Sequence, residues 1–295
     1  MNELGQLIIT GIKGTSLSDD EKKFLSEENI GGVILFDRNF ESTGQLWELT
    51  QSIQELKKEY PFFVAVDHEG GRVQRFKKIF TRIPAMFEVG KTHSPKVCFQ
   101  LHQIMAKELR ACGVNVNLAP VCDIWNNPQN KVIGDRAFGT HAEVVAKFAS
   151  AAIRGLQTEG VIACAKHFPG HGNTLKDSHF DLPIVKTPLK NLKSGEFIPF
   201  KRAIKSKVGM VMMAHLQVDF IDQQLPTSLS AKAHKLLRNE LGFKKVIISD
   251  DMVMEAITKH RGVKEAAALA IQAGSDIIEY RDMDAAKEAL IAIKE

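Results

Sequence analysis

Residues 166–179, which read KHFPGHGNTLKDSH, hold the densest group of side chains suited to acid–base chemistry. The glycines permit tight backbone geometry and the proline stiffens the turn, so we expect a loop that folds back on itself. Asp177 and His179 are two residues apart, close enough on a loop for the carboxylate to orient the imidazole. An imidazole held in this way exchanges a proton near neutral pH. The pattern indicates an acid–base pair; the alternative is a polar loop held by its own hydrogen bonds.

The same segment contains side chains that could bind a metal ion. They are His167, His171, Asp177 and His179. However, the sequence has no His-x-His near the first predicted strand and no helical His-Glu-x-x-His. The stretch Glu-Gly-Gly-Arg at 69–72 also lacks the spacing of either glycine-rich nucleotide motif. We therefore expect no catalytic metal and no glycine-rich phosphate-binding loop, and a metal-dependent hydrolase stays a less favoured alternative.

A pair of carboxylates, Asp250 and Asp251, ends an apolar run. Side chains alternate along a strand, so at most one of the two is expected to face the same site as the loop at 166–179. A carboxylate opposite a proton-transferring group suits covalent displacement at an anomeric carbon. One group attacks the carbon, while the other protonates the leaving oxygen and then activates water.

These residues follow short apolar runs of the kind that form buried parallel strands. The predicted strands are 32–36, 62–67, 114–120, 161–168, 208–215, 246–251 and 275–280, with a weaker one at 225–229. Ser18 and Glu21 fit a capping box that begins a helix running toward Glu28. Helical apolar spacing predicts further helices at 43–60, 95–111, 142–159, 188–206, 231–241, 263–273 and 284–294.

About eight strand–helix repeats favour a (β/α)₈ barrel, a TIM barrel of the α/β class, over an open doubly wound sheet. We found no long linker, so we expect one catalytic domain over residues 1–295. Active residues of such barrels lie at the carboxyl ends of the strands. Polar residues gather at these predicted ends, namely Asp67 with His68 and Glu69, Lys166 with His167, His215, and Asp250 with Asp251.

The composition is that of an ordinary globular protein, with 44% hydrophobic and 25% charged residues and a net charge of +4. No block of like charges suggests a nucleic-acid partner, and Lys201, Lys205 and Lys207 are expected on a solvated helix face. No stretch reaches the roughly 18 apolar residues of a membrane span, and the N-terminus lacks a signal-peptide pattern. The four cysteines form no Cys-x-x-Cys pair and are expected to be buried thiols. We expect a cytoplasmic monomer.

Taken together, four motifs in order resemble family 3 glycoside hydrolases, above all the single-domain β-N-acetylhexosaminidases of bacterial cell-wall recycling. They are AVDHEGGRVQRF (65–76), VIGDRAF (132–138), KHFPGHG…DSH (166–179) and SDDMVME (249–255), and the match runs from GGVILFDRNF (31–40) to about Glu255. The resemblance implies that Asp250 is the nucleophile, His179 the acid/base and Asp177 the carboxylate that tunes it. It also implies sugar-binding roles for Asp67, Arg75, Arg136, Lys166 and His167.

The implied activity is that of a retaining exo-β-N-acetylglucosaminidase that releases terminal N-acetylglucosamine from muropeptides, small glycan substrates, by double displacement without a metal or cofactor. β-Glucosidase, β-xylosidase, phosphorylase and non-catalytic sugar-binding readings stay open as alternatives. With no second α/β domain expected, no glutamate acid/base from such a domain is expected either. The last strand reads AGSDIIEY (273–280) where the family usually has Ala-Gly-Cys-Asp, and the chain ends soon after, so an irregular barrel is most expected at this last unit.

Overall fold

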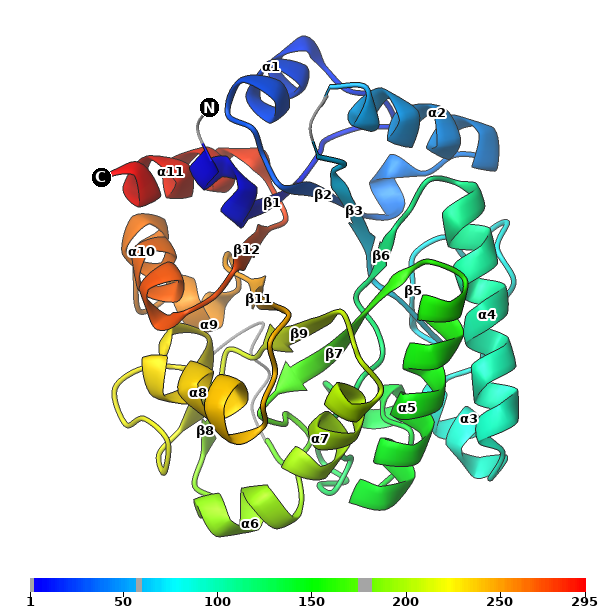
Figure 1. Ribbon diagram of the computed structural model, residues 1–295, viewed down its shortest axis with the longest axis vertical. Coiled ribbons are helices and arrows are strands. Elements are labelled where there is room, and N and C mark those ends of the chain that lie inside the picture. The colour runs from blue at the N-terminus through cyan, green and yellow to red at the C-terminus, as the bar shows by residue number, and fades with distance from the viewer. Residues whose placement is uncertain (1–2, 57–59, 175–181) are drawn as a thin grey trace.

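A closed barrel of eight parallel strands forms the centre of the computed structural model, which describes residues 3–56, 60–174 and 182–295 (Figure 1). The strands in barrel order are β1 (Ile8–Gly11), β12 (Ile277–Tyr280), β11 (Val246–Asp251), β9 (Met210–Met213), β7 (Ile162–Phe168), β6 (Val116–Asn117), β3 (Phe63–Val66) and β2 (Gly32–Leu35). Neighbouring strands are parallel throughout, which confirms the predicted TIM barrel.

Helices surround this barrel as an outer ring (Figure 1). In the described part of the chain they are α1 (Asp19–Glu27), α2 (Thr43–Gln54), α3 (Met86–Lys91), α4 (Pro95–Ala111), α5 (Ala142–Thr158), α6 (Leu189–Ser194), α7 (Phe197–Lys205), α8 (Ala231–Lys235), α9 (Glu255–Thr258), α10 (Val263–Ala273) and α11 (Met283–Lys294). The capping box at Ser18 and Glu21 is present. The helix predicted over 188–206 is two helices, because the chain turns at Gly195. The helix predicted over 231–241 continues from α8 as a π-turn.

The eighth strand is β1, and the weak prediction of a strand at 225–229 is wrong. That segment forms a 3₁₀ turn, Thr227–Leu229, after Pro226, which has no N–H to donate to a ladder. The hydroxyl groups of Thr227 and Ser228 in this segment form hydrogen bonds with a backbone carbonyl and a side chain instead. The strand Ile8–Gly11 was missed because it is only four residues long and directly follows a 3₁₀ helix.

The predicted irregularity of the last unit is not found in its closure. Strand β12 pairs with β1 in continuous register, Ile8 with Ile278 through Thr10 with Tyr280. Asp282 caps α11 by accepting a hydrogen bond from the Ala285 N–H at 2.9 Å. A register shift does occur on the other edge of β12, between the pairs Ile248–Ile277 and Asp251–Glu279. The last unit therefore closes the barrel and carries one bulge.

Side chains of the strands divide between two layers. Those that point into the barrel fill its interior with a packed apolar cluster: Ile9, Ile34, Ala65, Val116, Leu118, Cys164, Met210, Met212, Ile248 and Ile277. Their alternates pack outward against the helices, as Ile278 and Tyr280 of β12 do. The interior is thus a solid plug, and a pocket lies above it, at the carboxyl ends of the strands.

A bulge changes this alternation in β7. Ala165 pairs with Val211 and Phe168 with Met213, so two residues of β7, Lys166 and His167, stand opposite one residue of β9. Phe168 then returns to the outer layer. Both bulged side chains consequently face the space above the plug.

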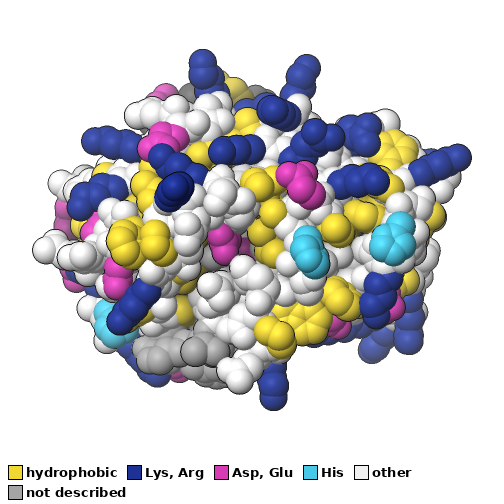
Figure 2. Space-filling view, turned by 90° about the horizontal axis from the view of Figure 1, so that it is seen from below, with side chains coloured by type: hydrophobic (Ala, Val, Ile, Leu, Met, Phe, Trp, Pro, Cys, Tyr) yellow, Lys and Arg dark blue, Asp and Glu magenta, His cyan; other side chains and the backbone are white. Residues whose placement is uncertain are grey.

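On the face shown in Figure 2, Lys and Arg side chains are spread out rather than gathered into one patch. Lys201, Lys205 and Lys207 are exposed at α7 and its carboxyl end, as expected for a solvated helix face. All four cysteines are buried and unpaired. None of the helices in the described ranges has the length and apolarity needed to cross a membrane.

Candidate active site

A pocket of about 460 Å³ lies above the apolar plug, at the carboxyl ends of the barrel strands. Its walls come from segments far apart in the sequence: Asp67, Glu69, Arg72, Val73, Arg75, Gln129, Lys131, Val132, Ile133, Arg136, Lys166, His167, His171, Met212, Asp250 and Glu279. The structure therefore brings together all six described residues of the predicted site. The other two, Asp177 and His179, lie outside the described residues.

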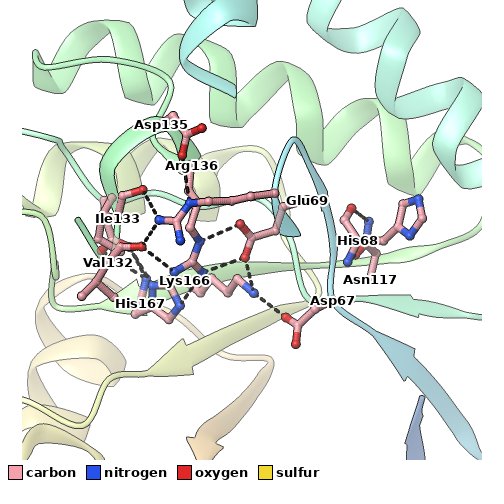
Figure 3. A network of polar contacts seen from close by, with 12 residues as sticks. Asp67, His68, Glu69, Asn117, Val132, Ile133, Asp135, Arg136, Lys166 and His167 are labelled. Atoms are coloured by element: carbon pink, nitrogen blue, oxygen red, sulfur yellow. Dashed lines mark hydrogen bonds and ion pairs between the residues drawn. The ribbon is translucent and has the colours of Figure 1, made fainter. Parts of the chain in front are cut away.

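A buried network of ion pairs forms one wall of the pocket (Figure 3). Lys166 Nζ lies 2.6 Å from Asp67 Oδ1 and 2.7 Å from Glu69 Oε1. Arg136 binds both oxygens of Glu69, each at 2.8 Å, so Glu69 lies between two cations. Bidentate charge-assisted bonds of this kind fix the orientation of both partners. Lys166 and Glu69 are almost wholly buried, so these pairs make the wall rigid.

The charges of this network stabilise one another against the cost of burial. Burial by itself would raise the pKa of Glu69, but Arg136 and Lys166 outweigh it and lower that pKa well below the ordinary value. Burial would likewise lower the pKa of Lys166, but Asp67 and Glu69 raise it above its usual range. Glu69 and Lys166 are consequently both charged at neutral pH.

Arg75 and Arg136 contact different carboxylates of the network, Asp67 and Glu69 respectively. Arg75 Nη2 lies 3.6 Å from Asp67 Oδ2, and its guanidinium stands 5.6 Å from the centre of the Phe36 ring. Arg136 also donates to the Val132 carbonyl at 3.2 Å. Asp67 is therefore bound by two cations and partly exposed to the pocket, which leaves it acceptor positions for a ligand.

His167 is positioned by Asp123, a residue that the sequence analysis did not select. Asp123 Oδ2 lies 2.7 Å from His167 Nδ1, and Asp123 Oδ1 accepts a 2.7 Å bond from the backbone N–H of His171. With Nδ1–H donating to Asp123, the other ring nitrogen Nε2 faces the Arg136 guanidinium at 3.4 Å. Burial opposes ionisation of Asp123, but His167 outweighs it and lowers the pKa of this carboxyl. His171, by contrast, has its pKa lowered to about 4 by burial, so it is neutral.

The two carboxylates at the end of β11 diverge, as alternation requires. Asp250 lines the pocket, whereas Asp251 forms an ion pair with Arg281. Burial disfavours the charge of Asp250, but His167 and the N–H of Asp251, which donates to Oδ1 at 2.9 Å, lower its pKa to about 2. Asp250 is thus an ionised carboxylate facing the pocket at neutral pH.

His215, another polar residue at a predicted strand end, does not line the pocket. It is wholly buried, with Nδ1 2.7 Å from Ser228 Oγ and Nε2 3.0 Å from the Asp251 carbonyl. Burial lowers its pKa, so the ring is neutral. It supports the backbone that carries Asp250.

Several pocket or supporting residues were absent from the predicted site, among them Glu69, Asp123, His171 and Glu279. Asp123 and Glu279 each interrupt an otherwise apolar run, a signal that could have identified them. Glu69 and His171 lie inside the motifs but depend on partners that only the fold reveals. Among the described residues, no group of three His, Cys, Asp or Glu side chains is placed to hold a metal ion.

Comparison with known proteins agrees with the family resemblance found in the sequence. The glycosyl hydrolase family 3 N-terminal domain matches residues 1–294. The chain belongs to this family. A family 3 relative named Beta-hexosaminidase, from Nitrosomonas eutropha, is 40% identical over 99% of the chain and 85% of that protein.

Solved structures of family 3 glycoside hydrolases superimpose closely on this chain. A β-N-acetylglucosaminidase from Paenibacillus sp. str. FPU-7 has a TM-score of 0.97 at 39% identity, and the match covers 99% of this chain and 57% of that one. NagZ from Neisseria gonorrhoeae in complex with N-trifluoroacetyl-D-glucosamine has a TM-score of 0.89 at 37% identity, covering 97% of this chain and 84% of that one. The chain therefore spans little more than half of the Paenibacillus protein. This family 3 member is a glycoside hydrolase with a TIM-barrel fold.

Proposed function

We propose that the protein is a retaining exo-β-N-acetylglucosaminidase. It would release terminal, non-reducing N-acetylglucosamine from muropeptide fragments in the cytoplasm, as a monomer of one domain without a cofactor. The observation that carries the proposal is the ionised Asp250 in a pocket whose facing wall is a rigid, charged network. The Beta-hexosaminidase name of the Nitrosomonas relative and the sugar analogue named with gonococcal NagZ support the choice of sugar.

The first chemical step is attack of Asp250 on the anomeric carbon. The bond from this carbon to the glycosidic oxygen breaks as His179 gives its proton to that oxygen, and a covalent glycosyl ester of Asp250 forms. In the second step His179 takes a proton from water, which attacks the same carbon and restores the carboxylate. Two inversions retain the anomeric configuration. Asp177 favours the charged imidazole that the first step requires.

The charged wall positions the sugar for this attack. Asp67 keeps acceptor positions for hydroxyl groups, while Lys166 and Arg136 fix its surroundings. His167, held by Asp123, presents one edge to the pocket. Because these groups are already bonded to one another, the wall needs little reorganisation when the sugar binds. A preorganised wall of this kind increases the rate of the attack on the anomeric carbon.

Hydrolysis of a matched set of nitrophenyl glycosides tests the proposal. We expect the β-N-acetylglucosaminide to be cleaved with a kcat/KM at least about 100-fold above that of the β-glucoside and β-xyloside, with β-N-acetylglucosamine as the first product. A preference for the glucoside or xyloside would refute the assigned sugar. A rate that requires phosphate, with a sugar 1-phosphate as product, would show a phosphorylase. Loss of activity in excess chelator would show a metal-dependent enzyme, and tight binding without turnover a sugar-binding protein.

A further inference from the structure

Glu279 occupies the interior of the barrel mouth and has no place in the mechanism above. It lies two residues after Ile277, which belongs to the apolar plug, so alternation along β12 points its side chain inward above that plug. It lines the same pocket as Asp250. Its backbone is fixed on both sides, since its N–H donates to Ser249 Oγ at 3.0 Å and its carbonyl accepts from Met252.

The carboxyl group of Glu279 is buried without compensation. The residue is 4% exposed, and its Oε2 has no hydrogen-bond partner among the residues that the structure describes. Within the same described ranges no Lys or Arg forms an ion pair with it: Lys166 pairs with Asp67 and Glu69, and Arg281 with Asp251. Leaving such a group unsatisfied costs stability, so a structural role does not explain it.

The charges around Glu279 keep it neutral. Burial is the main reason that its pKa lies well above the ordinary value, and the carboxylates of Asp67, Asp251 and Asp250 raise it further, while Lys166 opposes them. The nearby cations of the charged wall are already paired with other carboxylates. Arg75 pairs with Asp67, Arg136 with Glu69, and Lys166 with both of these carboxylates. A neutral carboxylic acid offers one O–H donor and one carbonyl acceptor, the pair that suits an uncharged sugar hydroxyl.

We propose that Glu279 is a specificity-determining residue that binds a hydroxyl group of the sugar held against Asp250. This inference rests on the proposed function, because it assumes the glycosidase reaction at Asp250. It assumes nothing about the identity of the aglycone. The sugar would supply the partner that the Glu279 carboxyl lacks in the free enzyme. The polar group is thus kept at a cost in stability that is recovered only when substrate binds.

The test compares Glu279→Leu, which removes both hydrogen-bonding atoms at similar volume, with Glu279→Gln, which keeps a donor and an acceptor. With the nitrophenyl β-N-acetylglucosaminide we expect Glu279→Leu to lose about 10- to 100-fold in kcat/KM and Glu279→Gln no more than about threefold. Glu288→Leu, on the exposed face of α11, is the matched control and should behave as the unaltered protein. The melting temperature of Glu279→Leu should equal or exceed that of the unaltered protein, because an uncompensated buried carboxyl is removed.

Nitrophenyl glycosides that lack the 3-, 4- or 6-hydroxyl identify the contact. For the analogue that lacks the hydroxyl bound by Glu279, the unaltered protein and Glu279→Leu should have the same kcat/KM. A Glu279→Leu variant that melts lower and loses the same factor on every analogue would assign the residue a structural role and overturn the proposal. So would full activity of Glu279→Leu on all of them. If the unaltered protein prefers another glycoside, the proposed sugar fails, and the same comparison on that glycoside still tests Glu279.

Discussion

The Oδ2 atom of Asp123 lies 2.7 Å from Nδ1 of His167, and Asp123 is wholly buried. The same carboxylate accepts the backbone N–H of His171, so one side chain fixes two histidines of the pocket wall. A carboxylate behind an imidazole fixes both the ring orientation and the tautomer. Asp123 is therefore a positioning residue for His167, the residue that binds the sugar in the proposed function.

Replacing Asp123 with Asn should separate this positioning role from simple folding. The amide of Asn still accepts one bond, but its NH₂ group meets N–H donors that the carboxylate satisfied. We expect kcat/KM to fall about 10- to 100-fold, mostly through KM, with a protein that still folds cooperatively. Steady-state kinetics with thermal melting measure both effects. Asp284→Asn, on the exposed first turn of α11, is the control, and an Asp123→Asn enzyme as active as this control would contradict the role.

Substitution of Asp250 by Asn should abolish turnover while the fold persists. The amide is a poor nucleophile, so we expect kcat to fall by at least about 10⁴-fold with an unchanged circular dichroism spectrum. A slowly reacting fluorinated sugar should label the unaltered protein, and peptide mass spectrometry should place the sugar on the peptide that contains Asp250. Label on another carboxylate, or near-normal turnover by Asp250→Asn, would remove Asp250 from the nucleophile's role.

A third prediction concerns His179, whose protonated form should be needed most for poor leaving groups. For His179→Gln we expect kcat/KM on an alkyl glycoside to fall about 10²- to 10⁴-fold, and that on a dinitrophenyl glycoside far less. Azide should accelerate the variant and yield a β-glycosyl azide, because a small anion replaces the water that has lost its base. Equal losses on both substrates without azide rescue would argue against an acid/base function.

The stability of the Glu69 network should depend on pH in a defined direction. The pKa of Glu69 is lower in the folded protein than its ordinary value of 4.5. Its ionised form therefore stabilises the fold above about pH 4.5, and this contribution is lost as the pH falls below that value. Glu69→Gln should lower the free energy of unfolding by about 3–5 kcal/mol at pH 7, because Arg136 and Lys166 lose a shared partner.

Melting curves from pH 7 to pH 3 measure this effect of Glu69. The difference between the unaltered protein and Glu69→Gln should shrink as the pH falls. Glu240→Gln, which removes an exposed ion pair with Lys193, should follow the curve of the unaltered protein. A difference that is constant across this range would mean that Glu69 contributes through packing and not through its charge.

Much of the barrel could be predicted from sequence because its strands are buried on both faces and appear as apolar runs. The strand ends at Asp67, Lys166 and Asp250 were found in this way, and the barrel rule then placed them around one pocket. Strand β1 escaped because four residues carry too little pattern, and its pairing with β12, more than 260 residues away, decides its conformation.

The predicted site was incomplete where function depends on a partner distant in sequence. Asp123 is 44 residues from His167, and Glu69 is 67 residues from Arg136. Neither spacing can be read from local pattern. A charged residue within an apolar run, as at Asp123 and Glu279, is the feature that marks such positions, because burial of a carboxyl requires a reason.

The bulge in β7 has a consequence for transplanting this site. A strictly alternating strand would send Lys166 and His167 to opposite sides, yet here both serve one pocket while Phe168 anchors the outer layer. Copying the two residues onto another barrel would therefore deliver only one of them to the substrate. The smallest portable unit is the stretch from Cys164 to Phe168 together with the β9 residues opposite it, Met210 to Met213. Deletion of Lys166 or His167 would remove the bulge, so the pocket would lose one side chain while Phe168 kept its place in the outer layer.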